Sequence, residues 1–242
     1  MALEYLKALL RTKSKIKPVF ISRNGDYHST ALVGDDTSAY AIRTKLYQTG
    51  SVRSVKKYIP KEIYPLLKSE IAYFGLPNKD LFADLSMYAL KTKTKEEYQK
   101  VFDVREGIEN RFIEQAKLSK DLNEILVEVK TKRYTYSNLK RIILSLLLDI
   151  RKEDVEAIKT LDVLPFVKVI AYKAERTDLL KAVSANTNII LRVNNVEKDQ
   201  TGLYKRLVDI EDRANQVYAM LQNKEAIIPN IAPDIYTRTI KI

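Results

Sequence analysis

The chain has 242 residues, of which 45% are hydrophobic and 30% are charged, and these proportions are typical of a globular protein rather than a disordered or fibrous one. It contains no cysteine and a single histidine, His28, which excludes disulfides, thiolate zinc sites, cysteine nucleophiles and metal sites built from several histidines. No run of about 18 apolar residues and no signal-peptide core is present, so we expect no membrane partner and a cytoplasmic location.

The net charge of +11 is concentrated near the N-terminus. Residues 1–61 contain twelve Lys and Arg but only four acids, which is a net charge of +8 in a quarter of the chain. A solvated basic surface would account for a lysine-rich composition alone. The clustering instead favours a partner that carries phosphate groups.

The chain begins with a predicted helix and a predicted strand. Leucines recur at helical spacing over residues 1–10 and predict a helix that starts almost at the first residue. The apolar centre of residues 16–22, IKPVFIS, predicts a short buried strand. A helix followed by a strand is half of an α/β unit, whose remaining strands we do not find in this chain.

Two further helices are predicted before Pro60. Thr37 or Ser38 is expected to cap a helix that runs to about Tyr47 and is closed by Gly50. Residues 51–58 predict a short basic helix. Beyond them the pattern changes to successive amphipathic helices, predicted at 62–74, 80–90, 95–101, 106–118, 122–129 and 152–160.

Residues 130–150, KTKRYTYSNLKRIILSLLLDI, are the stretch around which the rest is organised. The second half has apolar residues at i, i+3 and i+4 and predicts a helix buried on most sides, with Ser137 as its N-cap. No acid occurs from Val129 to Leu148. The basic and aromatic residues of the first half are Lys130, Lys132, Arg133, Tyr134, Tyr136, Lys140 and Arg141.

Such a stretch has the chemistry of an RNA-binding surface. Basic side chains bind the RNA backbone, and tyrosines stack on unpaired bases. The alternative is a solvated turn whose tyrosines pack against the core. Five cations within twelve residues and without an acid favour RNA.

Near the C-terminus the pattern changes again. Residues 165–172 and 188–193 are strand-like, and residues 176–185 between them are helical. This order predicts a β-α-β unit with parallel strands and a right-handed crossover. An amphipathic helix over residues 203–221 follows.

Two motifs near the N-terminus suit a phosphate ligand. Arg23 and His28 follow the predicted strand, at the end of a strand where α/β folds bind ligands. Ser38 opens a helix and Arg43 lies one turn inside it, where free amides and the helix dipole attract phosphate. A surface arginine and an ordinary capped helix are the alternatives, and no Walker-type or GxGxxG loop occurs.

Two pairs of adjacent acids, Glu153-Asp154 and Glu211-Asp212, are the remaining candidates for acid or base chemistry. Neighbouring residues on a helix point in different directions, so we interpret both pairs as surface charge. No catalytic residue and no metal ligand is assigned from the sequence.

The motif order resembles one family. SRNGDYH, SAYAIR about ten residues later, REGIENRF and KTKRYTYSNLKRIILSLLL follow one another as in the bacterial tRNA(Met) cytidine acetate ligases, which are described as nucleotidyltransferase-like proteins. The similarity runs from residue 1 to about residue 195. The TKRYTY run with its apolar helix is the most specific part.

The resemblance implies a fold, ligands and roles. The fold would be α/β and mostly α, with a remnant of a Rossmann-like nucleotidyltransferase domain at 1–58, a helical region at 59–160 and a small α/β unit at 161–242. Arg23, Ser38 and Arg43 would contact ATP, bound with Mg²⁺. The stretch from Lys130 to Arg141 would face elongator tRNA(Met), whose wobble cytidine becomes N4-acetylcytidine by way of acetyl-adenylate made from acetate.

Two departures from the family pattern bear on activity. Tyr40 stands where the family has a small hydroxyl residue. The nucleotide-binding half with its paired-histidine signature would lie before residue 1, so we expect the chain alone to be inactive and to need that half as a partner. The alternatives are an RNA-binding module without chemistry and a helical scaffold that binds an acidic protein.

Overall fold

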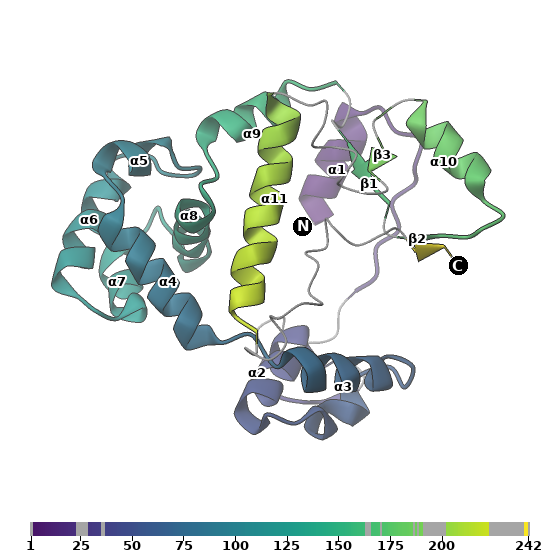
Figure 1. Ribbon diagram of the computed structural model, residues 1–242, viewed down its shortest axis with the longest axis horizontal. Helices are drawn as coiled ribbons and strands as arrows, with labels where there is room; N and C mark the ends of the chain where they lie inside the picture. Colours follow the sequence, from purple (N-terminus) through teal and green to yellow (C-terminus); the bar gives the residue numbers. More distant parts are fainter. Residues whose placement is uncertain are drawn as a thin grey trace. The chain divides into compact units, whose positions relative to one another are not determined.

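The computed structural model describes residues 2–22, 29–34, 37–162, 166–169, 171–185, 187, 189–190, 202–222 and 240–241. The described chain is mostly helical, as predicted (Figure 1). It divides into two compact units, Met1–Ile71 and Ala72–Ile242. The three-part division expected from the sequence stays a prediction. Within the described ranges, no helix combines the length and apolarity needed to cross a membrane.

The first unit is built from short helices whose ends follow the predicted caps. Ser38 Oγ accepts a hydrogen bond from the Ala41 amide at 2.9 Å, and Gly50, with φ of 60°, donates its amide to the Leu46 carbonyl at 2.8 Å. Both predicted caps are confirmed. The elements are α1 (Ala2–Arg11), α2 (Ala39–Thr49), the 3₁₀ helix η2 (Val52–Tyr58) and α3 (Ile63–Phe74), which runs across the boundary at residue 71.

The strand predicted over residues 16–22 is wrong. This segment has no regular secondary structure, and Val19, Phe20 and Ile21 are exposed. A strand requires a partner for its backbone groups, and no described segment pairs with this one. The apolar run therefore lies on the surface of its unit.

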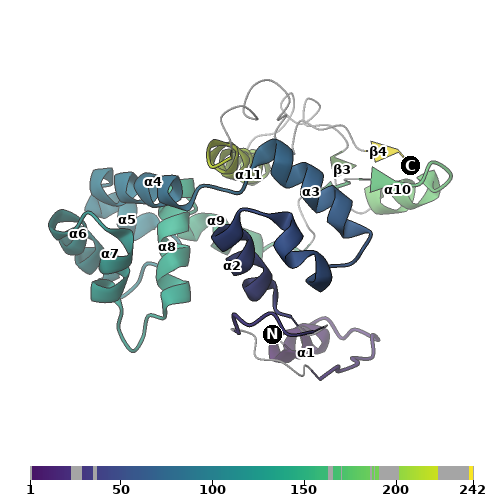
Figure 2. The same cartoon turned by 90° about the horizontal axis from the view of Figure 1, so that it is seen from below.

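The second unit holds the main core. Helix α8 packs against α4, α7 and α11, and Figure 2 shows it beside α4 and α7. Its buried side chains, among them Leu139, Ile142 and Ile143, belong to the core. Burial also raises the pKa of Tyr98, whose hydroxyl donates to the Leu90 carbonyl at 2.6 Å. The helices are α4 (Lys79–Thr92), α5 (Lys95–Lys100), α6 (Ile108–Leu118), α7 (Leu122–Val129), α8 (Tyr136–Leu148), α9 (Lys152–Lys159) and α11 (Leu203–Met220).

The central helix α8 starts two residues earlier than predicted. Its N-cap is Thr135, whose Oγ1 accepts from the Asn138 amide at 3.3 Å, and Ser137 lies inside the first turn. A hydroxyl at either position could cap the helix. The helix starts at the earlier position, which places Leu139 in the core one turn later. The helix ends at Leu148, and its C-cap Asp149 has φ of 52°.

One predicted surface acid is buried. Asp154 is only 5% exposed and receives hydrogen bonds from Arg206 Nε at 3.0 Å and Nη2 at 3.1 Å. On the same side of α11, Arg213 Nη1 donates to the Leu148 carbonyl at 2.6 Å. Asp154 therefore fastens α9 to α11, and the surface interpretation of this residue was wrong because its partner is 52 positions away in sequence.

The predicted β-α-β unit is confirmed. Strands β1 (Val167–Lys168) and β3 (Ile189–Ile190) pair in parallel, and α10 (Thr177–Ser184) lies between them in sequence. A second parallel pair joins β2 (Ala171–Tyr172) to β4 (Ile240–Lys241). Lys168 Nζ, 3.2 Å from Glu211 Oε1, connects β1 to α11.

Candidate nucleic-acid interface

The loop between α7 and α8 is held by a tyrosine. Tyr134 is 9% exposed, and its hydroxyl donates to the Arg105 carbonyl at 2.7 Å. Its amide donates to Thr131 Oγ1 at 3.2 Å. Burial raises the pKa of Tyr134, so its hydroxyl stays a hydrogen-bond donor into more alkaline solution than an exposed tyrosine would. Tyr134 therefore positions the loop, and its ring does not face solvent as a base-stacking surface would require.

Tyr136, in contrast, is the tyrosine of this stretch that reaches solvent. It is 42% exposed on the first turn of α8. Lys130 Nζ lies 5.4 Å from the centroid of its ring, within the range of a cation–π contact. An exposed ring beside a cation can stack on an unpaired base.

All five cations of the stretch are exposed, and two of them pair with acids from the loop between α5 and α6. Arg133 Nη1 donates to Glu106 Oε2 at 2.5 Å, although the arginine side chain is 77% exposed, and this hydrogen bond raises the pKa of Arg133. Arg141 Nε donates to Asp103 Oδ2. The sequence interpretation missed both acids, because they lie 27 and 38 positions from their partners.

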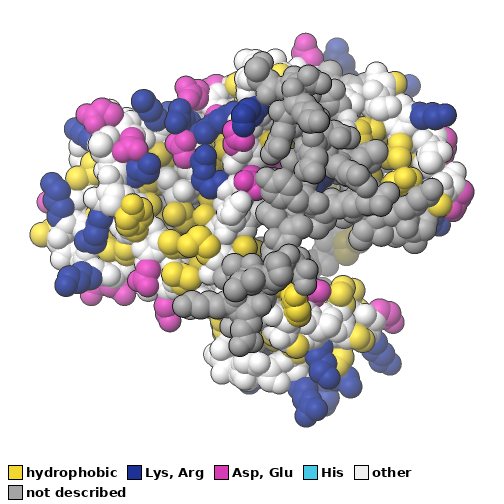
Figure 3. All heavy atoms as spheres, viewed as in Figure 1, with side chains coloured by type: hydrophobic (Ala, Val, Ile, Leu, Met, Phe, Trp, Pro, Cys, Tyr) yellow, Lys and Arg dark blue, Asp and Glu magenta, His cyan; other side chains and the backbone are white. Residues whose placement is uncertain are grey.

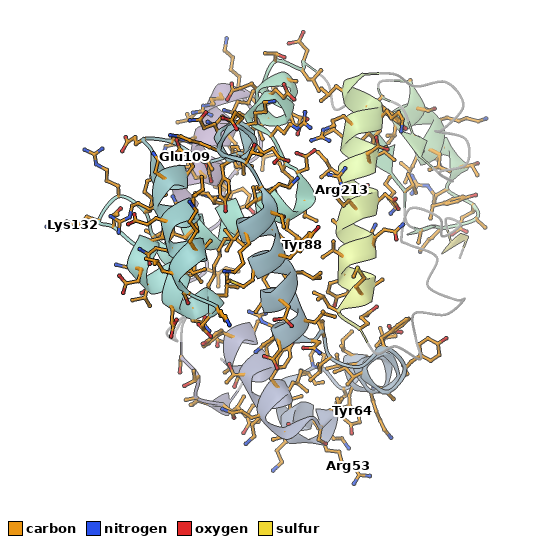
Figure 4. All side chains as sticks on the ribbon, turned by 60° about the vertical axis from the view of Figure 1, so that its left-hand side comes forward. Arg53, Tyr64, Tyr88, Glu109, Lys132 and Arg213 are labelled. Atoms are coloured by element: carbon orange, nitrogen blue, oxygen red, sulfur yellow. The ribbon has the colours of Figure 1, made fainter. Side chains whose placement is uncertain are left out.

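The three lysines of the stretch, Lys130, Lys132 and Lys140, have no acid partner in the part of the chain that the structure describes. Lys132 points away from the ribbon at the left edge of Figure 4. We call the exposed set the α7–α8 basic surface; it consists of Lys130, Lys132, Arg133, Tyr136, Lys140 and Arg141.

A shallow pocket of about 330 Å³ adjoins this surface. Lys132 and Arg133 line it from the loop, and Arg111 and Gly107 line it from the start of α6. Arg111 also ties α6 to the end of α7 by donating to the Glu128 carbonyl at 2.5 Å. The cations around the pocket are thus held by a fixed scaffold, and a fixed cationic surface suits a polyanion such as RNA.

The residues expected to contact ATP are described only in part. Ser38 is buried and its hydroxyl is already used, since it caps α2 and donates to the Ser29 carbonyl at 2.8 Å. Arg43 is exposed on α2, one turn further along. Arg23 and His28 lie outside the described residues. The structure thus brings Ser38 and Arg43 to one helix, and their roles toward ATP stay predictions.

A site for Mg²⁺ does not emerge from the described residues. No group of three or more acidic or histidine side chains comes together there to hold a metal ion. Asp103, for example, is engaged by Arg105 at 3.3 Å and by Arg141. We therefore assign no residue of the described ranges to Mg²⁺.

Comparison with known proteins connects these observations to a family. Residues 1–229 match the family model described as HIGH Nucleotidyl Transferase. The chain belongs to this family. The match extends through the β-α-β unit and α11, well beyond the motifs quoted from the sequence.

The curated relatives agree with the resemblance drawn from the motifs. The tRNA(Met) cytidine acetate ligase of Alkaliphilus metalliredigens is 33% identical over 233 residues, which are 93% of this chain and 54% of the relative. The enzyme of the same name from Thermosipho melanesiensis is 30% identical over 245 residues, covering 99% of this chain and 54% of the relative. The chain spans about half the length of the curated relatives it matches.

Solved structures show the same fold. The apo form I crystal structure of Thermotoga maritima TmcAL has a TM-score of 0.84 at 23% identity and covers 99% of this chain and 59% of that chain. Form II of the same protein, bound with alpha-thio ATP, has a TM-score of 0.80 at 22% identity and covers 100% and 58%. The likeness confirms the expected nucleotidyltransferase fold class.

Proposed function

We propose that the chain is the RNA-docking part of an ATP-dependent tRNA(Met) cytidine acetate ligase. The proposal rests on one observation above all. The segment with the most specific resemblance to these ligases forms a fixed surface with five exposed cations, and the similarity extends over 93% of the chain. A surface of this kind neutralises RNA phosphates.

The proposed reaction has two chemical steps. A carboxylate oxygen of acetate attacks the α-phosphorus of ATP, and pyrophosphate leaves. The exocyclic N4 amine of the wobble cytidine then attacks the carbonyl carbon of acetyl-adenylate, AMP leaves, and the amine loses a proton. Holding the tRNA so that this amine reaches the adenylate is a positioning task, which accelerates a reaction without any new chemistry.

On the RNA side, Lys132 and Lys140 bind phosphates directly. Arg133 and Arg141 are held in place by Glu106 and Asp103 and offer their remaining donors to the backbone. Tyr136 stacks on an unpaired base. Tyr134 acts through the loop, whose conformation it holds.

On the nucleotide side, the N-terminal unit contributes one wall of the ATP site. Arg43 on α2, together with Arg23, binds the phosphates of ATP, and these phosphates hold the Mg²⁺. Ser38 fixes the start of α2 beside them. In-line attack requires ATP to be held from both sides, so we expect a paired-histidine half to complete the site. Cytoplasmic tRNA would be the substrate.

The test is ATP-dependent transfer of labelled acetate to a tRNA(Met) transcript. The chain alone is compared with the chain joined to the N-terminal half of the A. metalliredigens relative. We expect the joined protein to acetylate the tRNA and the chain alone to bind it without acetylation. A joined protein that folds, binds tRNA and transfers no acetate would contradict the enzymatic proposal.

An RNA-binding module without chemistry is the second candidate, because the whole α7–α8 basic surface lies within one compact unit. ATP binding separates the two candidates, since only the ligase part requires it. If the chain bound tRNA and an unrelated acidic protein with equal affinity, neither the ligase part nor the RNA-binding module would be supported. That result would point to a scaffold that binds acidic proteins.

A further inference from the structure

A second cluster of cations lies in the unit Met1–Ile71, and the function proposed above uses only Arg23 and Arg43 among the cations of this unit. Between residues 37 and 61 the sequence has six Lys and Arg and no acid. Figure 3 shows Lys and Arg side chains gathered at the lower edge of the view, over this unit. We call Arg53, Lys56, Lys57 and Lys61, four exposed residues on and just after η2, the η2 basic patch.

The 3₁₀ geometry of η2 sorts its side chains into rows. With three residues per turn, every third residue lies in the same row. Val52 and Val55 form the buried row. Arg53 and Lys56 consequently share one exposed row, about 6 Å apart along the helix axis, and Lys57 lies in the other. Arg53 reaches outward at the lower end of the view in Figure 4.

The patch is mounted on a rigid support. The valine row of η2 packs against α2, whose Ala41 and Leu46 are buried. Thr49 Oγ1 and Ser54 Oγ lie 2.9 Å apart and join the end of α2 to η2. A preorganised patch loses little conformational entropy when it binds a partner.

The cations of the patch are not neutralised by this protein. No ion pair joins any of the four to an acid within the ranges that the structure describes. Lys56 Nζ instead lies 5.1 Å from the centroid of the Tyr64 ring. Like charges three or four residues apart on a helix repel each other, and a bound polyanion would relieve that repulsion.

The surroundings of the patch favour RNA over other anions. A helix that lies on a lipid surface buries an apolar face in the membrane, whereas the apolar face of η2 is already covered by α2. A protein partner would need an apolar centre at the interface, and the exposed rows of η2 carry only basic and hydroxyl side chains. Phosphates bind to isolated exposed cations without such a centre.

We propose that the η2 basic patch is a second contact site for the sugar-phosphate backbone of RNA, separate from the α7–α8 basic surface. It binds phosphates without reading bases. This inference rests on the proposed function, since it takes the RNA substrate of that function as the partner. The four residues of the η2 basic patch have no role in the proposed ATP site or in the α7–α8 basic surface, and this proposal gives them one.

The test compares three proteins for binding to an unmodified tRNA(Met) transcript over a series of salt concentrations. The first is the wild type, and the second carries Arg53→Gln, Lys56→Gln and Lys57→Gln. The third carries Lys117→Gln, Lys120→Gln and Lys181→Gln, three exposed lysines elsewhere, as a control with the same change of charge. Circular dichroism and thermal unfolding check the fold of each.

We expect the patch variant to bind at least about tenfold more weakly at low salt, and the slope of log K against log salt to become shallower by about 2 to 3. The control should keep the wild-type slope. A folded patch variant with the wild-type slope would overturn the proposal. If the triple variant does not fold, Arg53→Gln and Lys57→Gln alone should each reduce the slope by about 1.

Two further arms separate this proposal from the one on which it rests. A Lys132→Gln/Lys140→Gln variant that loses tRNA binding while the patch variant keeps it would overturn the patch alone. Absence of tRNA binding by the wild type would overturn both. Binding of the wild type to vesicles containing phosphatidylserine, lost in the patch variant while tRNA binding is kept, would assign the patch to a lipid surface instead.

Discussion

At the residue scale, the cations of the α7–α8 basic surface differ in whether an acid already neutralises them. Arg133 and Arg141 each donate to a carboxylate from the loop before α6. Lys132 and Lys140 have no such partner among the described residues. A phosphate must compete with the carboxylate for the arginines, whereas it meets the lysines without competition.

Lys132→Ala and Lys140→Ala should therefore each weaken tRNA binding and make its salt dependence shallower by about 1 unit of slope. Arg133→Ala should weaken it as well, by less. All three side chains are exposed, so the unfolding temperature should change little. Filter binding measures the affinities, with Lys120→Ala as the control, and a Lys132→Ala protein that binds like the control would count against the assignment.

Glu106→Gln should have the opposite effect. The substitution removes a negative charge from the surface and weakens the hydrogen bond that holds Arg133, so tRNA binding should become tighter at low salt. The gain should disappear at high salt, where charges on the surface are screened. Unchanged or weaker binding at low salt would indicate that Glu106 orients Arg133 productively for RNA.

A buried tyrosine predicts how stability depends on pH. Burial raises the pKa of Tyr98, so the unfolded chain loses this proton before the folded chain does. The hydroxyl contributes its full stability below the ordinary tyrosine pKa of about 10 and loses it as the pH rises toward the folded-state value.

Tyr98→Phe should lower the free energy of unfolding near pH 8 by about 0.5–1.5 kcal/mol, because the hydrogen bond to the Leu90 carbonyl is lost. Between pH 9 and 11 the difference from wild type should shrink. Urea unfolding of both proteins at each pH measures this difference in the free energy of unfolding. A difference that stays constant from pH 8 to pH 11 would contradict the raised pKa of Tyr98.

At the element scale, α8 is the helix on which both the core and the basic surface depend. Leu146 is 2% exposed and belongs to the main core, whereas Leu144 on the opposite side of the helix is 40% exposed. The helix is buried over most of its circumference, as predicted, but Leu144, which was expected to widen the buried stripe, lies on the exposed side.

Leu146→Ala should destabilise the second unit by about 2–5 kcal/mol, the range for removing a large buried side chain. Leu144→Ala, which changes the same side chain on the same helix, should cost well under half as much. Denaturant unfolding of both variants provides the comparison. Equal losses would mean that the two faces of α8 are assigned wrongly.

Features with a local cause were predictable from the sequence. The ends of α2 follow from Ser38 and Gly50, because capping involves residues three or four apart. The parallel β1–β3 pair follows from the order of strand, helix and strand. The existence of the α7–α8 basic surface likewise follows from a run of residues contiguous in sequence.

Features with a distant cause were not predictable. Asp154 is buried where Arg206 pairs with it, and the buried Tyr134 donates a hydrogen bond to the backbone carbonyl of Arg105, 29 positions away. Arg141 of the basic run likewise pairs with an acid that is distant in sequence, Asp103. The predicted strand at 16–22 failed because pairing depends on a second strand, which local apolarity cannot reveal.

At the scale of the whole molecule, two basic surfaces belong to two separate compact units. The family match covers both units, and the similarity to tRNA(Met) cytidine acetate ligases does too. Each surface carries exposed cations that can bind RNA phosphates. We infer that tRNA binding draws on both, and that its salt dependence reports the sum of their contacts.

The affinity of the 242-residue chain for a tRNA(Met) transcript, measured over a salt series, tests this inference most directly. Seven exposed cations have no acid partner in the described ranges, three from the α7–α8 basic surface and four from the η2 basic patch. They predict a slope of log K against log salt of about −5 to −6. A slope near zero, or binding to tRNA no tighter than to an acidic protein, would contradict it.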